Sequence, residues 1–504
     1  MVLFSRGRKA PKKPDTHNLA GGRAYSLSPQ RELLDIALTS KLQRQFYREP
    51  DETMRRVRRL VKEAGPEFAA RCALYTRHRM GLRSISHLLA AEVSRRASGE
   101  QWLSDFYRLV ARRPDDMREI IACIMGGPEF GEGVARKSGK GRKRNGHALP
   151  NSLKRGFARR FEQFDEYQLG AYRGEGQGVS LVDVMRLVHP RETEAIRKLK
   201  DGTLRSQKQD AKLTRSGQLA DNAESAAQLK REVWHAEIER MGYNALVMNA
   251  RGILASAPEL KGRLCERIED AEAVRRSLIQ PLQIYRAYRE LEDRQLRLSL
   301  SRAIDLACAN VPRFEGRTLV AFDESGSMTA WTHGDMKIPA IEYASLFAAI
   351  LARSQDADVI SFDTTARYRK YDLGNTTLSI AEDWHVARGG GTDMGTIFSR
   401  MRGKYDRVIV LTDMQSWYGV DPEKAAALYE KKQRRPLKIY SFDLTGYGTA
   451  LFRPGSIQML SGVSFGVFDT IARLDQGGDV LMDEVNAVRF TDEWVQSVRD
   501  SHGK

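Results

Sequence analysis

The amino-acid sequence predicts a multidomain protein in which an all-helical module precedes a doubly wound α/β domain. Three observations favour this fold class: the length of 504 residues, a change of hydrophobic periodicity near residue 317, and an uneven division of charge. A single hydrophobic core rarely grows beyond about 250–300 residues, so two or more domains are expected. We place the helical module at residues 1–316 and the α/β domain at residues 317–504.

Apolar residues in the first module recur at the spacing of amphipathic helices. They fall every three or four positions between Trp102 and Val110, and again between Met117 and Ile124, with Pro114 between the two segments. Similar blocks follow one another along the module, and no convincing strand is predicted before about residue 310. Short helices with one apolar face bury it by stacking in pairs, which indicates a HEAT-like helical repeat.

Two segments interrupt this helical pattern. Residues 126–150 are glycine-rich and then strongly basic, which predicts an exposed loop. Residues from about 191 to 228 are polar and charged, and we interpret them as an insertion or a poorly packed helix.

Short apolar runs of a different kind begin near residue 317. Residues 318–322 and 407–411 are continuous apolar runs that each end close to an aspartate, as expected of strands buried on both faces of a parallel sheet. Strand and helix candidates alternate, which favours a doubly wound α/β domain. The further strand candidates are residues 358–362, 438–442 and 463–468, and residues 340–353 are a helix candidate.

The positive charge of the chain is concentrated in the first module. Residues 1–316 hold 60 Lys and Arg against 40 Asp and Glu, a net of +20, whereas residues 317–504 hold 22 against 25, a net of −3. A polyanion-binding module joined to a domain with a different task has this distribution.

Other features of the composition set the expected compartment. The sequence has no apolar run of the roughly 18 residues needed to span a bilayer and no signal-peptide pattern, so we expect a cytoplasmic protein. The cysteines are far apart and lie in apolar helical contexts, which indicates buried thiols and neither zinc ligands nor disulfides. They are Cys72, Cys123, Cys265 and Cys308.

Hydroxyl and carboxylate side chains follow the predicted strand ends of the second domain. Ligands of open α/β sheets bind outside the carboxyl ends of the strands. Oxygen-only ligands suit Mg²⁺, or Mn²⁺, and do not suit a thiolate-seeking metal. The alternative is that Asp323 and the serines only cap the next helix. The candidate metal ligands are Asp323, Ser325, Ser327, Thr392 and Asp413.

A run of ten cations without an acidic residue lies between Arg136 and Arg160. Such a run binds phosphates with salt-dependent affinity and little sequence preference. A solvated loop, an acidic-protein contact or a nuclear-localisation signal would have the same composition, but the charge of the whole module favours nucleic acid. The candidate RNA contacts in this run are Arg142, Lys143, Arg144, Lys154, Arg155, Arg159 and Arg160.

The segment that follows Ser180 predicts an amphipathic helix that stops at Pro190. Arg186 and His189 lie on its last turn. Taken alone, a histidine at this position most often interacts with the helix dipole.

The metal constellation resembles the metal-ion-dependent adhesion site of von Willebrand factor A domains, whose pattern is D-x-S-x-S, then Thr, then Asp. This resemblance implies that Ser325, Ser327 and Thr392 contact the ion. It also implies that Asp323 and Asp413 hold the ion largely through water.

The helical module resembles the TROVE module of the Ro ribonucleoprotein family. The similar segments are Asn18 to Gly22 with Tyr25, the basic run with Leu153, residues 181–190, and Trp234 through Leu254. The chain departs from the family pattern at Val188 and Met248, and residues 191–228 have no recognised counterpart.

The resemblance implies a monomeric ring of helical repeats closed by the A domain. It also implies binding of structured small RNA of the Y RNA type and of single-stranded 3′ ends of misfolded or processed RNA, for RNA quality control or maturation. His189 and Arg186 become candidate RNA contacts on this basis. An exoribonuclease such as polynucleotide phosphorylase is an implied partner.

Two other functions remain open at this point. A von Willebrand A-domain adaptor acting with an AAA+ ATPase or another acidic protein would account for the second domain, but not for the charge of the first. A nuclease using Asp323 and Asp413 is the third hypothesis. Two-metal hydrolysis requires several carboxylates in direct contact with the ions, and this constellation is mostly hydroxyls, so we do not expect an enzyme.

Overall fold

The computed structural model describes residues 14–18, 21–39, 50–125, 149–172, 178–204, 226–329, 338–386, 388–416, 419–444, 458–461, 468, 471–472 and 480–502. Within these residues, no helix combines the length and the apolar character that crossing a membrane requires. The chain divides into two compact units. The sheet unit contains residues 1–28, 45–48 and 222–480, and the helical unit contains residues 29–44, 49–221 and 481–504.

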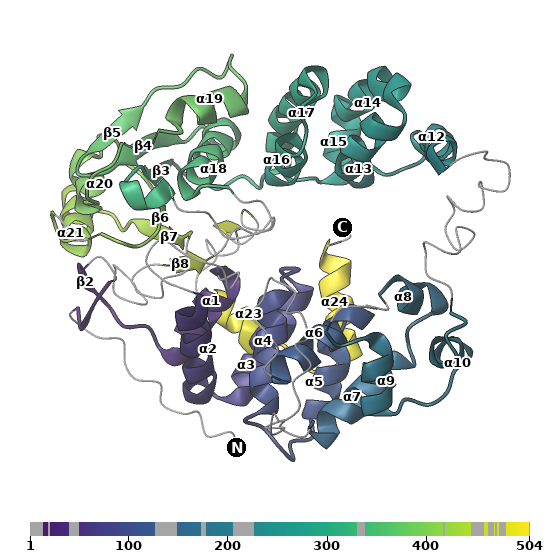
Figure 1. Cartoon of the computed structure of the whole chain (residues 1–504). Coiled ribbons are helices and arrows are strands. Elements are labelled where there is room, and N and C mark those ends of the chain that lie inside the picture. Colours follow the sequence, from purple (N-terminus) through teal and green to yellow (C-terminus); the bar gives the residue numbers. More distant parts are fainter. Residues whose placement is uncertain are drawn as a thin grey trace. The chain divides into compact units, whose positions relative to one another are not determined.

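The sheet unit is built on six strands in the order β5-β4-β3-β6-β7-β8 (Figure 1). All neighbouring pairs are parallel except β4 with β5, which are antiparallel. The predicted doubly wound domain is therefore confirmed, with one antiparallel edge strand that the sequence did not predict. The strands are β3 (Thr318–Asp323), β4 (Asp358–Phe362), β5 (Ala366–Arg369), β6 (Arg407–Thr412), β7 (Lys438–Asp443) and β8 (Gln458–Ser461).

Helices cover both faces of this sheet. On one face, Phe322 stacks with Trp384, and Phe347 packs against Phe442. The core of the other face joins Leu319 and Val410 to residues such as Ile397. Helices on both faces explain why β3 and β6 are buried along their whole length. The helices are α18 (Ala340–Gln355), α19 (Thr377–Trp384), α20 (Gly395–Arg400) and α21 (Pro422–Gln433).

Two further groups of elements belong to the sheet unit. A short antiparallel hairpin, β1 (Thr16–His17) with β2 (Arg23–Ala24), corrects the prediction of no strand before residue 310. Two-residue strands are too short to produce an alternating pattern. The helices are α12 (Ala226–Glu237), α13 (Tyr243–Ser256), α14 (Lys261–Ile268), α15 (Ala271–Ser277), α16 (Pro281–Arg289) and α17 (Arg294–Ala307).

The described residues of the helical unit form helices joined by turns and short loops. The first six are α1 (Pro29–Thr39), α2 (Pro50–Ala64), α3 (Pro66–His78), α4 (Ser84–Ser94), α5 (Leu103–Val110) and α6 (Pro114–Ile124). They are followed by α7 (Asn151–Phe161), α8 (Glu166–Ala171), α9 (Leu181–Val188), α10 (Glu194–Lys200), α23 (Val480–Ala487) and α24 (Asp492–His502).

The end of the chain packs against helices α3 and α5 of the helical unit. Arg71 Nη1 donates to the carbonyl of Asn486 at 2.6 Å, and the rings of Trp102 and Phe490 stack with centroids 4.8 Å apart. The compact units consequently divide the chain differently from the ranges 1–316 and 317–504: α12 to α17 share a unit with the sheet, and α24 does not.

Some predicted segments fall outside the described residues. They include residues 126–148 of the basic loop, 205–225 of the polar insertion and 463–467 of the strand candidate 463–468. The four cysteines form no disulfide; Cys123 is partly exposed and the other three are buried.

A buried carboxylate, Asp116, links several helices of the helical unit. It accepts hydrogen bonds from Arg77 Nη2 at 2.7 Å, from His87 Nε2 at 2.9 Å and from the backbone NH of Arg113 at 3.0 Å. Burial alone would raise the pKa of Asp116, but the hydrogen bonds and charges of His87 and Arg77 outweigh burial and hold its pKa below the ordinary value. The ionised form is thus the one that the fold stabilises.

Replacing this carboxylate is expected to destabilise the helical unit. Asp116→Asn should lower the free energy of unfolding by about 3–5 kcal/mol, because it leaves Arg77 buried without its counter-charge. The stability that Asp116 contributes to the fold is complete at pH values above the pKa that its carboxyl group has in the unfolded chain. This stability is lost as the pH falls through the lower pKa that the group has in the folded protein. Urea unfolding at neutral and acidic pH measures both effects. Glu119→Gln on the same helix, at a half-buried position, is the control, and an equal loss in both variants would contradict the assignment.

Candidate functional site

The first loop of the candidate metal centre follows strand β3. Asp323 is buried at the strand end, where its Oδ1 accepts from the Ser325 backbone NH at 2.8 Å and its Oδ2 accepts from Thr412 Oγ1 at 2.7 Å. The hydroxyl oxygens of Ser325 and Ser327 are 3.3 Å apart. One carboxylate and two hydroxyls are therefore held close together by the turn that ends β3.

The second loop is rich in glycine and carries Thr392. Gly389 and Gly390 have φ values of 70° and 128°, which side chains with a Cβ rarely adopt. A Cβ on Gly326 would lie 3.9 Å from the Cα of Gly389, and the Arg388 backbone NH donates to the Glu324 carbonyl at 3.0 Å. The glycine loop thus contacts the first loop.

The third loop follows strand β6, the neighbour of β3. Asp413 accepts from the Gln415 backbone NH at 3.1 Å, and Ser416 Oγ donates to the Thr392 carbonyl at 2.7 Å. The second oxygen of Asp413, Oδ2, is buried and has no hydrogen-bond partner within the part of the chain that the structure describes. A buried carboxylate oxygen without a hydrogen-bond donor is a suitable ligand for a cation.

The electrostatics of the two carboxylates agree with that interpretation. Burial raises the pKa of Asp413 to about 8, and the negative charge of Asp323 adds to the rise. Burial also raises the pKa of Asp323, to about 6, although hydrogen bonds from Ser325 and Thr412 oppose it. Two carboxylates that burial and mutual repulsion bias toward the neutral form become stable as anions when a divalent cation lies between them.

The donors present fit a hard metal ion. The site supplies two carboxylates and the hydroxyls of Ser325, Ser327 and Thr392, which are oxygen ligands of the kind that Mg²⁺ prefers. Over the described ranges, no group of three or more His, Cys, Asp and Glu side chains could hold a metal. The two observations are compatible because most donors in this site are hydroxyls. The structure brings all five predicted residues to the carboxyl edge of the sheet.

Glu324 is a residue of this site that the sequence analysis missed. It is fully buried, and its carboxylate pairs with Arg367 at 3.0 Å, with Arg388 at 3.4 Å and with Arg369. Glu324 therefore holds the glycine loop next to the first loop. Arg367 also pairs with Asp363 at 3.0 Å, so three guanidinium groups face two carboxylates and one positive charge remains in this cluster. In the sequence, Glu324 could have been recognised by its position inside the D-x-S-x-S motif, directly after a buried strand.

Asn18 also supports the metal loops. Its Nδ2 donates to the Ser416 carbonyl at 2.6 Å, and its Oδ1 accepts from the Gly22 backbone NH at 2.7 Å. The hairpin β1–β2 is thereby attached to the loop after β6. The sequence marks Asn18 and Gly22 only as a family motif, because contacts across almost 400 positions leave no local pattern.

The candidate RNA contacts that are described lie in the helical unit, on α7 and at the end of α9. Arg155, Arg186 and His189 are exposed, and Lys154 is partly exposed. His189 ends α9 in a left-handed conformation, with φ 51°, and its backbone NH donates to the Met185 carbonyl at 3.0 Å. Arg142, Lys143 and Arg144 lie outside the described residues.

Two arginines of α7 have structural partners. Arg159 pairs with Asp105 at 2.9 Å, and Arg160 donates to the carbonyl oxygens of Ala111 at 2.7 Å and Arg112 at 3.0 Å. Arg160 thus satisfies backbone groups at the carboxyl end of α5.

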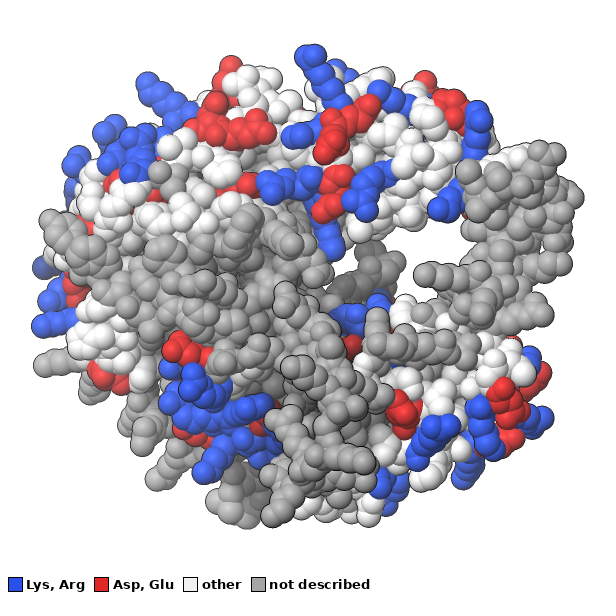
Figure 2. Space-filling view, in the orientation of Figure 1, with Lys and Arg blue, Asp and Glu red and all other residues white. Residues whose placement is uncertain are grey.

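Helix α2 carries a basic surface that the sequence analysis did not single out. Figure 2 shows Lys and Arg gathered over this helix. Its exposed cations are Arg55, Arg58, Arg59 and Lys62. Four cations within about two helical turns could have predicted this basic surface. The acidic residues beside them reduce the net charge of the segment, so it did not stand out in the sequence.

Comparison with known proteins decides the family. A TROVE domain matches residues 40–224, and a Ro60 vWA domain matches residues 317–473. The chain is a Ro-like protein. The predicted resemblance is thereby confirmed.

Two relatives of this Ro-like chain come from Deinococcus radiodurans. RNA-binding protein RO60 is 27% identical over 222 residues, which are 40% of this chain and 41% of that protein, so the alignment spans about two-fifths of the relative. The crystal structure of the RO (RSR) protein is 21% identical, covers 91% of this chain and 99% of that one, and has a TM-score of 0.59. This structural match confirms the predicted fold class of helices followed by a von Willebrand factor A domain.

The buried carboxylates make the stability of the metal-free sheet unit depend on pH. Because the folded pKa of Asp413 is raised, ionising this group above its ordinary pKa costs stability, and the cost grows until the pH passes about 8. In EDTA, Asp413→Asn should therefore stabilise the protein more at pH 8 than at pH 5, by roughly 3–4 kcal/mol in the free energy of unfolding, and raise the melting temperature accordingly. Differential scanning fluorimetry measures this, with the exposed Asp383→Asn as control. A pH-independent difference would contradict the assignment.

Proposed function

We propose that this Ro-like protein binds RNA through its helical unit. The TROVE match over residues 40–224 carries this proposal, together with the exposed cations of α7, α9 and α2. The Deinococcus radiodurans relative is named an RNA-binding protein, which supports the same function. The role is one of recognition and not of catalysis.

The physical basis is phosphate neutralisation followed by recognition of unpaired bases. Each phosphate that Lys or Arg neutralises releases counterions, so affinity falls steeply with salt. Duplex RNA is recognised mostly by shape and phosphate contacts, whereas single strands also offer bases for stacking and hydrogen bonding. Arg186 and His189, exposed at the end of α9, can contact both kinds of group.

The proposed ligands are structured small non-coding RNA of the Y RNA type and RNA with a single-stranded 3′ end. Binding of both classes would serve RNA quality control or maturation. Selection for a free end would depend on accessibility and not on sequence, which suits a surface whose contacts are mainly charges.

We propose that the sheet unit binds Mg²⁺, or Mn²⁺, at the site described above. Ser325, Ser327 and Thr392 would contact the ion, and Asp323 and Asp413 would hold it largely through water. The bound ion would supply a positive charge that can take an acidic group. Arg367 and Arg388 extend that positive charge beyond the metal loops.

A second candidate function follows from this positive edge. An acidic protein partner could dock at the metal site, and the partner would be an exoribonuclease such as polynucleotide phosphorylase or an AAA+ ATPase. The cluster of three arginines around Glu324 is the observation that favours it.

RNA binding can be tested without disturbing the structural arginines. In a variant with Lys154, Arg155 and Arg186 changed to glutamine, affinity for a small structured RNA with a single-stranded 3′ tail should fall by at least tenfold. The slope of log affinity against log salt should decrease by about one for each phosphate that the variant no longer neutralises. Fluorescence anisotropy across a salt series, with tailed and blunt forms of the RNA, measures both.

The matched control changes Arg275 and Arg276 of α15 to glutamine, since both are exposed in the sheet unit. RNA affinity in this control should equal that of the wild type. Binding that is insensitive to salt, or that the triple variant retains in full, would refute the proposal.

The metal proposal predicts a separate result. Mg²⁺ should raise the melting temperature of the wild type, and Ser325→Ala or Thr392→Ala should abolish most of this rise because each removes a ligand hydroxyl. Ser379→Ala, at an exposed position of α19, is the control and should respond like the wild type. An equal response in all four proteins would exclude this site.

A further inference from the structure

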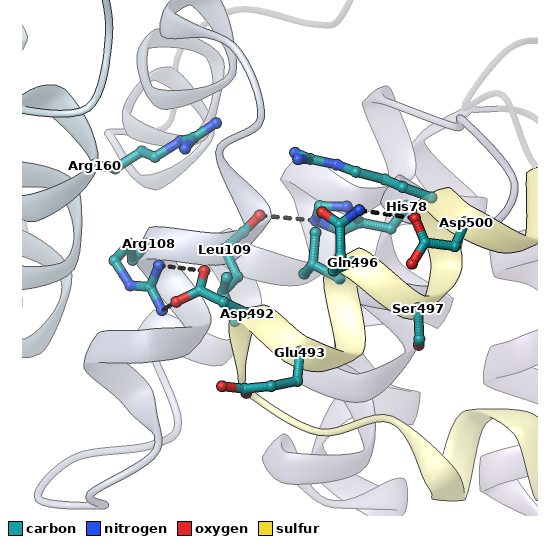
Figure 3. Close-up of a pocket in the computed structure, with 11 residues that line it drawn as sticks. His78, Arg108, Leu109, Arg160, Asp492, Glu493, Gln496, Ser497 and Asp500 are labelled. Carbon is teal, nitrogen blue, oxygen red and sulfur yellow. Dashed lines mark hydrogen bonds and ion pairs between the residues drawn. The ribbon is translucent and has the colours of Figure 1, made fainter. Parts of the chain in front are cut away.

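A polar pocket in the helical unit is not explained by the functions proposed so far. It has a volume of about 570 Å³ and is lined by side chains of α3, α5, α7 and α24 (Figure 3). Pockets of about 300–1,000 Å³ commonly bind small ligands. Its ionisable lining consists of His78, three arginines and three acidic residues, namely Arg108, Arg160, Arg499, Asp492, Glu493 and Asp500.

One ion pair forms a wall of the pocket. Arg108, which is 8% exposed, donates from Nη1 to Asp492 Oδ1 at 2.7 Å and from Nη2 to Oδ2 at 3.0 Å (Figure 3). This two-point contact uses both oxygens of Asp492 and attaches α24 to α5. The negative charge of Asp492 is therefore largely committed to Arg108.

Arg160 faces the same space with only neutral partners. It donates to the carbonyl oxygens of Ala111 and Arg112 and to Gln163 Oε1 at 2.9 Å, and it lies over the Phe164 ring, with Cζ 4.7 Å from the ring centroid. Burial lowers the pKa of Arg160 to about 10, and the positive charges of Arg499 and Arg108 act in the same direction. Its charge is held in place but is not compensated.

Arg499 supplies the second uncompensated charge. Among the described residues, no ion pair to its side chain is found, and it acts electrostatically on Arg160, Arg112 and His78. Burial lowers the pKa of His78 to about 3, against its hydrogen bond to the Leu109 carbonyl, so this ring is neutral at physiological pH. The charges that act on His78 and Arg112 at this side of the pocket are consequently mainly positive.

The remaining acidic groups of the pocket, Glu493 and Asp500, are not among the main charges that act on Arg160. Gln496 Nε2 donates to Asp500 Oδ1 at 2.8 Å, and Figure 3 shows the Glu493 side chain directed away from Arg160. The causes that lower the pKa of Arg160 outweigh the opposing charges of Asp116 and Asp492. An anion in the pocket would relieve the repulsion between the guanidinium groups.

We propose that this pocket, closed by the C-terminal helix α24, binds a phosphate group through Arg160 and Arg499. The planar guanidinium group presents donors in a fixed geometry that matches phosphate oxygens, and partial burial strengthens the attraction. The volume leaves room for a sugar and base attached to the phosphate. The phosphate belongs either to a free phosphate compound or to an RNA strand, and the site does not depend on the proposed RNA surface of α7 and α9.

Isothermal titration with inorganic phosphate and with adenosine 5′-monophosphate tests the site in the full-length protein. Arg499→Gln should weaken binding by roughly tenfold, whereas Arg499→Lys should retain part of it because the charge remains. Arg499 is exposed and makes no described ion pair, so its replacement should not disturb folding. Arg276→Gln in α15 is the control and should bind as the wild type does. No binding by the wild type, or equal binding by all variants, would overturn the proposal.

Competition with short oligoribonucleotides identifies the source of the phosphate. If a 5′-phosphorylated oligonucleotide displaces adenosine 5′-monophosphate and the 5′-hydroxyl form does not, the site binds an RNA end. If neither displaces it, the site binds free phosphate compounds, and both results support the pocket. If the protein binds phosphate but not RNA, only the function proposed for α7 and α9 is refuted. If it binds RNA but not phosphate, only the proposal for this pocket is refuted.

Discussion

Two buried carboxylates at the ends of neighbouring parallel strands constrain the whole edge of the sheet. Because β3 and β6 run in the same direction, Asp323 and Asp413 emerge at the same edge, where burial and mutual repulsion raise the pKa of both. The surrounding loops provide hydroxyls, and Glu324 and Asn18 hold those loops in place. The donors of this arrangement are those that a hard cation prefers, which is the basis of the proposed metal site.

The strands that were predicted correctly are those whose burial leaves a continuous apolar run. Strands β3, β4, β6 and β7 are of this kind, since helices cover both faces of the sheet. Strand β5 (Ala366–Arg369) has two arginines among four residues and lies at the sheet edge, so its sequence carries no such run. Placement of α24 with the helical unit depends on contacts such as Arg108 with Asp492, which join residues almost 400 positions apart.

The candidate sites were predictable to different degrees for a related reason. The metal residues follow strand ends, so their convergence follows from sheet topology, and a short motif marks them. The basic run of α7 was visible as composition, but composition does not distinguish the exposed Arg155 from Arg160, which is bound to backbone carbonyls. A sequence shows the charge of a residue, but it does not show whether the side chain forms an ion pair or a hydrogen bond in the folded protein.

The proposed function depends most directly on contact between RNA and helices α7 and α9 of the helical unit. Photocrosslinking with 4-thiouridine placed in the 3′ tail and in the stem of a small structured RNA tests this directly, with crosslinked peptides identified by mass spectrometry. We predict crosslinks in peptides that contain Lys154, Arg155, Arg186 or His189, abolished at high salt and independent of Mg²⁺. Crosslinks confined to the loops of Ser325, Thr392 and Asp413 would exclude α7 and α9 as the RNA site and assign RNA binding to the A domain.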